Sequence, residues 1–155
     1  MRIDIKWDKP IRLKDGAKVN QVYYCPGLER VSAKSGVYIF ARTFGNLVVP
    51  LYIGQAKGLK GRITQQLNNV RLMVGLQQAD IGHRILLVAR LKLRRGQQKK
   101  KVLDIVESSL IKHALTQGHV LLNKQGVKTS VHTIKSKGNR SSKQIAPLTM
   151  LVERK

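Results

Sequence analysis

Glu107 is the residue whose surroundings most strongly indicate chemistry. It lies within the helical stripe formed by Leu103, Leu110 and Ile111, where a charged side chain is seldom placed without a partner. A site that cleaves phosphodiesters needs a carboxylate to hold a divalent cation, and the chain has only 8 Asp and Glu residues. Glu107 therefore either ligates a metal or pairs with an arginine. Asp104, one turn earlier, is either a second ligand or an acid favoured by the helix dipole.

Two tyrosines and an arginine form a second group of interest. Tyr38 and Tyr52 fall in two β-rich runs, and a hairpin centred on Gly45 would place their rings opposite each other, about 5 Å apart at Cβ. The simpler alternative is that both are good strand formers on a half-buried surface. After Gly54, which permits a tight exit from the strand, Arg62 falls near a helix start, where free N–H groups favour anions. Arg62 could therefore bind a phosphate, or it could be one of 30 solvated cations.

The apolar pattern predicts the elements that must position these residues. In chain order they are a hairpin of residues 36–41 and 47–53, a helix over 57–76, a strand over 83–93 and a helix over 102–117. Pro50 lacks a ladder donor, which predicts a bulge or a free side there, and Gly118 predicts the end of the last helix. This order predicts an α/β (α+β) fold.

The length of 155 residues predicts a single domain, residues 1–155. Residues 1–33 are expected to form an N-terminal arm, irregular around a short strand or two. Residues 34–125 would form the core, and 126–155 a basic C-terminal extension. Within this extension, we expect a flexible loop over 135–143 and a final strand or packing segment over 145–152.

The net charge of +22 predicts a polyanionic partner. Nucleic acid is favoured over a membrane, because no apolar run reaches the roughly 20 residues of a span and no basic face carries aromatic anchors. The N-terminus does not resemble a secretory signal, so a cytoplasmic location is expected. A single cysteine, Cys25, excludes an internal disulfide; it is either a nucleophile or, more commonly, a buried thiol.

Five sequence elements in order resemble the GIY-YIG nucleases. They are Gly36-Val37-Tyr38, Tyr52-Ile53-Gly54, Arg62, Glu107 and Asn123. Residues 56–62 are also similar to the corresponding segment of bacterial excision-repair nucleases, and the resemblance covers roughly residues 35–123. It implies a small central three-stranded sheet flanked by helices, with terminal extensions outside the shared core.

The resemblance also implies a role for each matching residue. Glu107 would bind one divalent cation, Mg²⁺ or in its place Mn²⁺, and Arg62 would stabilise phosphate charge. Tyr38 would be the base or water-positioning group and Tyr52 its neighbour. Gly36, Gly54 and Asn123 would support the structure of the site without taking part in the chemistry, with Asn123 as an anchor. The chain departs from the family at Gln55, where many members have lysine, and its two tyrosines are more widely spaced than is commonest.

The expected function is therefore metal-dependent endonuclease cleavage of DNA, with duplex DNA as the favoured substrate. A restriction or mobile-element enzyme is favoured over a repair or structure-specific one, acting as a monomer or homodimer. The cations expected to contact nucleic acid are Lys57, Lys60, Arg94, Arg95, Lys99, Lys100 and Lys101. The alternative is a non-catalytic basic protein that binds RNA or the ribosome, since charge alone predicts binding and not cleavage.

Overall fold

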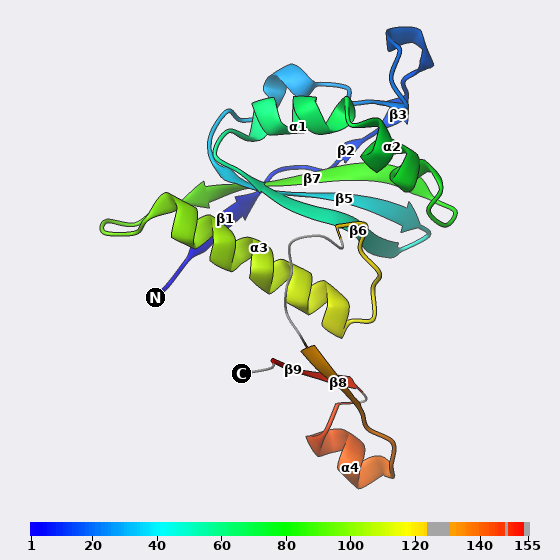
Figure 1. The fold of residues 1–155 in the computed structure, drawn as a ribbon, viewed down its shortest axis with the longest axis vertical. Helices are drawn as coiled ribbons and strands as arrows, with labels where there is room; N and C mark the ends of the chain where they lie inside the picture. Colours follow the sequence, from blue (N-terminus) through cyan, green and yellow to red (C-terminus); the bar gives the residue numbers. More distant parts are fainter. Residues whose placement is uncertain (124–130, 148, 154–155) are drawn as a thin grey trace.

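The fold is a mixed α/β arrangement built on an antiparallel sheet of five strands (Figure 1). The computed structural model describes residues 1–123, 131–147 and 149–153. The sheet order is β1-β7-β5-β6, with β2 also paired to β7. Its strands are β1 (Asp4–Trp7), β2 (Ile11–Arg12), β5 (Gly36–Phe44), β6 (Leu47–Ala56) and β7 (His83–Lys92). The predicted hairpin and third strand are thus confirmed.

The expected three-stranded sheet is wrong, because the N-terminal arm adds two strands to it. β1 and β2 pair with β7 along the edge that faces away from β5. Pairing satisfies the backbone groups of that edge. It also packs Ile3 and Ile5 against a buried cluster that includes Val37 and Val102. The arm further contains a small separate ladder of β3 (Lys14–Asp15) with β4 (Tyr23–Tyr24).

Helices cover both faces of the sheet (Figure 1). One face carries α1 (Leu59–Leu67) and α2 (Val70–Gln77), and the other carries α3 (Lys99–Thr116). The single helix predicted over 57–76 is wrong, because the chain breaks at Asn68-Asn69. Asn69 accepts a hydrogen bond from the Leu72 backbone N–H at 3.1 Å and so caps a new helix. The helix predicted over 102–117 is confirmed as α3, and Gly118 lies just after its end with a φ of 84°.

The alternation along β5 separates two halves of the core. Tyr38 and Phe40 point toward α1 and α2, where they join a cluster with Ile63 and Met73. The intervening residues of β5 point toward α3. Because strand neighbours face opposite sides, the two tyrosines and the α3 carboxylates approach the sheet from different faces.

The hairpin register differs from the predicted one. Tyr38 lies opposite Gly54 and Phe40 opposite Tyr52, so the predicted direct pairing of Tyr38 with Tyr52 is wrong. The register then shifts, and Ala41 lies opposite Pro50. Pro50 was predicted to mark a bulge or a free side, and both are present: Leu51 has no partner in the register, and β6 is an outer strand of the sheet. The turn pairs Phe44 with Leu47 and not with Asn46, which moves the pairing by one residue, and the bulge moves it by one more.

The C-terminal part forms a small unit beyond the end of α3 (Figure 1). It consists of a two-stranded ladder of β8 (Val131–Lys135) and β9 (Thr149–Glu153), with α4 (Arg140–Ile145) between them. The flexible loop predicted over 135–143 is wrong in its second half. Asn139 accepts from the Ser142 N–H at 2.9 Å and so starts α4. None of the helices in the described part of the chain is long and apolar enough to cross a membrane.

Candidate active site

Two carboxylates of α3 converge on one amide of β6. The Nε2 atom of Gln55 donates to Asp104 Oδ1 at 2.7 Å and to Glu107 Oε2 at 2.9 Å. Glu107 is half-buried, and no lysine or arginine of the described residues forms an ion pair with it. A charged side chain in an apolar stripe needs a polar partner to offset its desolvation. In this structure the partner of Glu107 is the Gln55 amide, and not the arginine of the alternative prediction.

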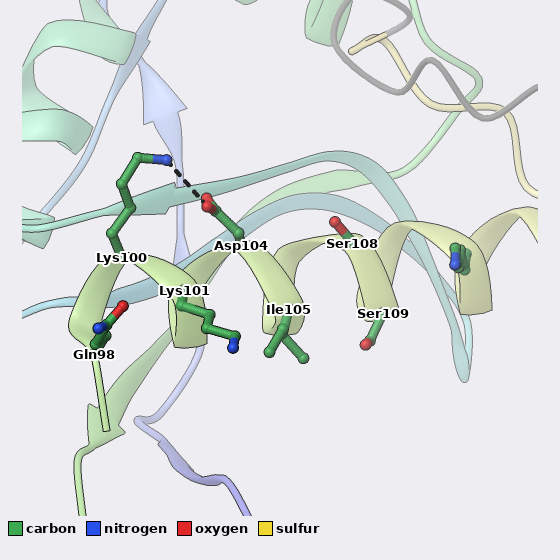
Figure 2. Close-up of a pocket in the computed structure, with 8 residues that line it drawn as sticks. Gln98, Lys100, Lys101, Asp104, Ile105, Ser108 and Ser109 are labelled. Atoms are coloured by element: carbon green, nitrogen blue, oxygen red, sulfur yellow. Dashed lines mark hydrogen bonds and ion pairs between the residues drawn. The ribbon is translucent and has the colours of Figure 1, made fainter. Parts of the chain in front are cut away.

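Asp104 has a second partner on its outer side. Lys100 Nζ lies 3.0 Å from Asp104 Oδ2, one helix turn away, and Figure 2 shows this pair on the exposed surface of α3. The hydrogen bond from Gln55, followed by that from Lys100, holds the pKa of the Asp104 carboxyl below its ordinary value. Asp104 therefore stays charged at neutral pH.

Arg62 faces the same region from α1. A hollow of about 550 Å³ opens between the end of β6, the start of α1 and the start of α3. We refer to it as the carboxylate hollow; its polar lining residues are Gln55, Lys57, Arg62, Gln65, Lys100 and Asp104. Arg62 is exposed there, so its guanidinium is accessible to an anion. The successive elements β6 and α1 and the distant helix α3 thus bring cations and a carboxylate together.

The tyrosines meet around a buried glutamine. Gln66 Nε2 donates to Tyr38 Oη at 2.8 Å and to Tyr52 Oη at 3.2 Å. The rings are 6.2 Å apart and nearly parallel at 24°, because diagonal neighbours across a ladder can still stack. Asn69 Nδ2 donates to Gln66 Oε1 at 3.4 Å, which fixes the amide with its nitrogen toward the phenols.

The two phenols differ in their access to solvent. Tyr38 is 1% exposed, whereas Tyr52 is half-buried. Burial raises the pKa of Tyr38 far above its ordinary value of 10, although the Gln66 hydrogen bond and the charge of Arg62 act in the opposite direction. Tyr38 is consequently a neutral phenol at physiological pH.

Two glycines make room for this arrangement. A Cβ atom at Gly54 would lie 2.5 Å from the Tyr38 Cζ and Oη atoms, so the tyrosine ring rests directly on the glycine backbone. A Cβ at Gly36 would collide with the carbonyl of Ala89 in β7. Any side chain at either position would displace the tyrosine or the sheet. Both residues therefore have a steric reason to be glycine.

Asn123 ties the segment after α3 to the sheet. Its Nδ2 atom donates to the Ile53 carbonyl at 2.7 Å, and the Leu122 N–H donates to the Leu51 carbonyl at 2.7 Å. These contacts fasten the chain to β6 close to Tyr52. The geometry agrees with the anchoring role that was expected of Asn123.

The basic residues expected to contact nucleic acid are distributed unevenly. Lys57 and Lys100 line the carboxylate hollow, whereas Arg94 Nε pairs with Asp4 at 2.8 Å. Lys60 Nζ donates to the Glu29 carbonyl at 3.3 Å. The remaining three are the exposed residues Arg95, Lys99 and Lys101. The hollow thus gathers only part of the predicted cationic set.

Cys25 is a buried thiol. Desolvation raises its pKa to about 11, so the thiolate needed for nucleophilic attack is scarce at neutral pH. The structure therefore favours the commoner of the two alternatives for this residue.

Sequence reasoning missed Gln66 and the bridging role of Gln55. Gln66 is 9% exposed and lies between Ile63 and Leu67 on the apolar side of α1. A polar residue within such a stripe is a signal for a buried hydrogen bond. The position of Gln66 in the stripe is visible in the sequence, but the groups to which its amide donates are not.

No family model matches this chain, and no curated protein or solved structure is significantly similar to it.

Proposed function

We propose that this chain is a metal-dependent endonuclease of the GIY-YIG type that hydrolyses phosphodiester bonds in duplex DNA. The observation that carries the proposal is the convergence of Asp104 and Glu107 on the single Gln55 nitrogen, beside a hollow that Arg62 lines. Carboxylate oxygens and a guanidinium are the two kinds of group that phosphodiester hydrolysis requires. The order of motifs along the chain supports the family assignment.

The carboxylate pair suits one Mg²⁺ ion, with Mn²⁺ as a substitute. Both carboxylates contact the same Gln55 nitrogen, so a cation that took the place of this amide would face both of them. Mg²⁺ is usually held by one or two carboxylates together with water and substrate phosphates. When bound, the ion would polarise the phosphate and acidify a water molecule.

The side chains of the chain itself would bind and orient the substrate. Arg62 and Lys57 would receive the scissile phosphate and neutralise the charge that grows on it in the transition state. Tyr52 is the phenol with access to solvent, so of the two tyrosines we assign to it the contact with the substrate, from the face of the sheet opposite the carboxylates. Tyr38, 1% exposed and fixed by Gln66, would position Tyr52. This assignment reverses the order of the two tyrosines that the family resemblance implies.

The substrate assignment follows from charge and composition. The net charge of +22 supports binding to a phosphate backbone, and the chain has only 2 Phe and 1 Trp to stack on unpaired bases. We therefore assign duplex DNA as the substrate. The alternative, a non-catalytic protein that binds nucleic acid, is tested by the cleavage experiment below. Mapping of the product ends separates restriction or mobile-element cleavage from structure-specific cleavage.

The test is cleavage of plasmid DNA by the wild-type chain and by Glu107→Gln, with and without Mg²⁺. We expect the substitution to lower cleavage by more than the roughly 100- to 1,000-fold that loss of one charge-stabilising donor costs. Thermal stability without metal should hold or rise, because a half-buried charge is removed. The matched control is Asp80→Asn, which removes a carboxylate with 88% of its side chain exposed that neither lines this hollow nor lies on the N-terminal arm. A fully active Glu107→Gln protein, or a wild-type chain that binds DNA and never cuts it, contradicts the proposal.

A further inference from the structure

A second basic hollow lies on the N-terminal arm. It has a volume of about 640 Å³ and opens between the β1–β2 connection, the 3-10 helix η2 (Leu28–Arg30) and β7. We refer to it as the N-terminal groove. Five cations line it, Lys9, Arg12, Lys14, Arg30 and Arg90, against the single carboxylate of Asp8.

The cations of the N-terminal groove are held to different degrees. Arg90 pairs with Asp8 at 3.0 Å, and Arg12 contacts His83 Nδ1 at 2.7 Å. Arg30 extends over Gly27, where a Cβ would lie 3.2 Å from the guanidinium. Among the described residues, neither Lys9 nor Lys14 forms an ion pair. Arg30 Nε also lies 3.9 Å from Glu29 Oε1, so Asp8 and Glu29 offset at most two of the five cations and most of the positive charge of the groove is uncompensated.

The groove adjoins the carboxylate hollow through the start of α1. The Lys60 N–H donates to the Ser32 carbonyl at 3.0 Å, and Lys60 Nζ donates to the Glu29 carbonyl at 3.3 Å. Ser32 lines the N-terminal groove, whereas Gly58 and Gly61 on either side of Lys60 line the hollow. A polyanion that passes over the start of α1 would therefore reach both.

We propose that the N-terminal groove binds the sugar–phosphate backbone of duplex DNA outside the position that is cut. This inference rests on the proposed function for the location of the cut. No aromatic residue lines the groove, so it lacks the stacking platform on which single-stranded nucleic acids are usually bound. Cations without base-stacking groups suit phosphates, and they position a duplex without reading its sequence.

The test compares two triple variants of equal charge. Lys9→Ala/Lys14→Ala/Arg30→Ala removes three cations of the groove, and Lys18→Ala/Arg71→Ala/Lys92→Ala removes three exposed cations that line neither hollow. Binding to a duplex is measured by fluorescence anisotropy in EDTA over a range of salt concentrations. We expect the groove variant to bind about 10- to 100-fold more weakly and its log–log salt slope to fall by up to about 3 units, at roughly 0.9 per phosphate contact. The control variant should stay within a few-fold of wild type.

The inference is overturned if the two triple variants have the same affinity for the duplex and the same salt slope. It is also overturned if the groove variant loses binding to single-stranded RNA but not to the duplex. If circular dichroism shows that the triple groove variant is unfolded, the single variants Lys9→Glu and Lys14→Glu replace it, because both side chains are exposed. The assay contains no metal, so its failure is distinct from failure of the nuclease proposal. A wild-type chain that never cleaves, but whose binding depends on the groove, refutes the nuclease and supports the groove.

Discussion

The two sides of β6 hold their polar groups by different means. On one side, Tyr38 and Tyr52 share the Gln66 amide within a neutral network that packing encloses. On the other, Gln55 holds Asp104 and Glu107 at a more open and charged surface. Tyr52 and Gln55 lie on the same strand, with their side chains on opposite faces of the sheet.

This contrast separates a fixed part of the candidate site from an exchangeable part. Buried hydrogen bonds between neutral groups are costly to break, because no water replaces the lost partner. The Asp104 side chain is 47% exposed, so water or a cation can replace its partners at little cost. Substitutions on the tyrosine side should therefore have the larger effect on stability, and substitutions on the carboxylate side the larger effect on activity.

After Glu107→Gln, the largest effect on cleavage is expected for Arg62→Ala, which also tests this contrast. Loss of one group that stabilises transition-state charge should lower the cleavage rate by about 100- to 1,000-fold. DNA affinity should change by only a few-fold, since one charge among 30 contributes little to the general field. Single-turnover cleavage and anisotropy on one preparation measure both quantities.

Arg71→Ala is the matched control for Arg62→Ala, because Arg71 is equally exposed on the next helix and lies outside the carboxylate hollow. Parallel losses of binding and cleavage in Arg62→Ala would assign it to general DNA binding.

The second effect concerns the fixed side, where Gln66→Leu should lower the free energy of unfolding by about 1–3 kcal/mol. The substitution keeps similar bulk but leaves the buried Tyr38 hydroxyl without its donor. Urea unfolding followed by fluorescence measures the change. Gln65→Leu, at the exposed neighbouring position, should have a much smaller effect. If both variants unfold alike, the tyrosine network does not hold the fold together.

The fold was partly predictable because local patterns determine much of it. Alternation identified β5, β6 and β7, and helical spacing identified α3. Ile5 pairs with Leu91, which is far away in the sequence, so the residue pattern of the arm alone does not predict that β1 joins the sheet. The break at Asn68-Asn69 depends on a side-chain cap that competes with an otherwise continuous helical stripe.

The candidate site was predictable in its residues but not in its contacts. Glu107 stood out because a charge interrupted an apolar stripe, and Arg62 because of its helix position. The register of the tyrosines was missed because the turn pairs Phe44 with Leu47 and not with Asn46, and because a bulge near Pro50 shifts the pairing further. The role of Gln55 could not be predicted, since it depends on how closely α3 approaches β6. Such distances follow from packing of the whole core.

A third prediction tests the burial of the Tyr38 phenol by pH. Its folded-state pKa lies above the ordinary value of 10, so its contribution to stability is fully present below pH 10 and is lost as the pH rises beyond it. We expect a loss of up to about 1.4 kcal/mol per pH unit above pH 10. Tyr38→Phe should remove this part of the alkaline loss, as measured by urea unfolding from pH 9 to 11. Tyr24→Phe, at an exposed position, is the control. Identical alkaline profiles for wild type and Tyr38→Phe would contradict a desolvated phenol.

The smallest expected effect belongs to the exchangeable side and concerns Asp104 at acid pH. The Gln55 and Lys100 contacts hold its pKa below the ordinary value of 3.8, so its contribution is present above that pH and is lost as the pH falls through the lower folded-state pKa. Asp104→Asn should therefore lose stability less steeply than wild type below about pH 4, in melting temperatures measured from pH 6 to 2.5. Asp80→Asn, which removes a carboxylate with 88% of its side chain exposed, serves as the control. The difference should be small, because solvent screens a carboxylate at this open surface. An effect as large as that of Gln66→Leu would mean that the carboxylate side is also part of the fixed structure, and the contrast between the two sides of β6 would fail.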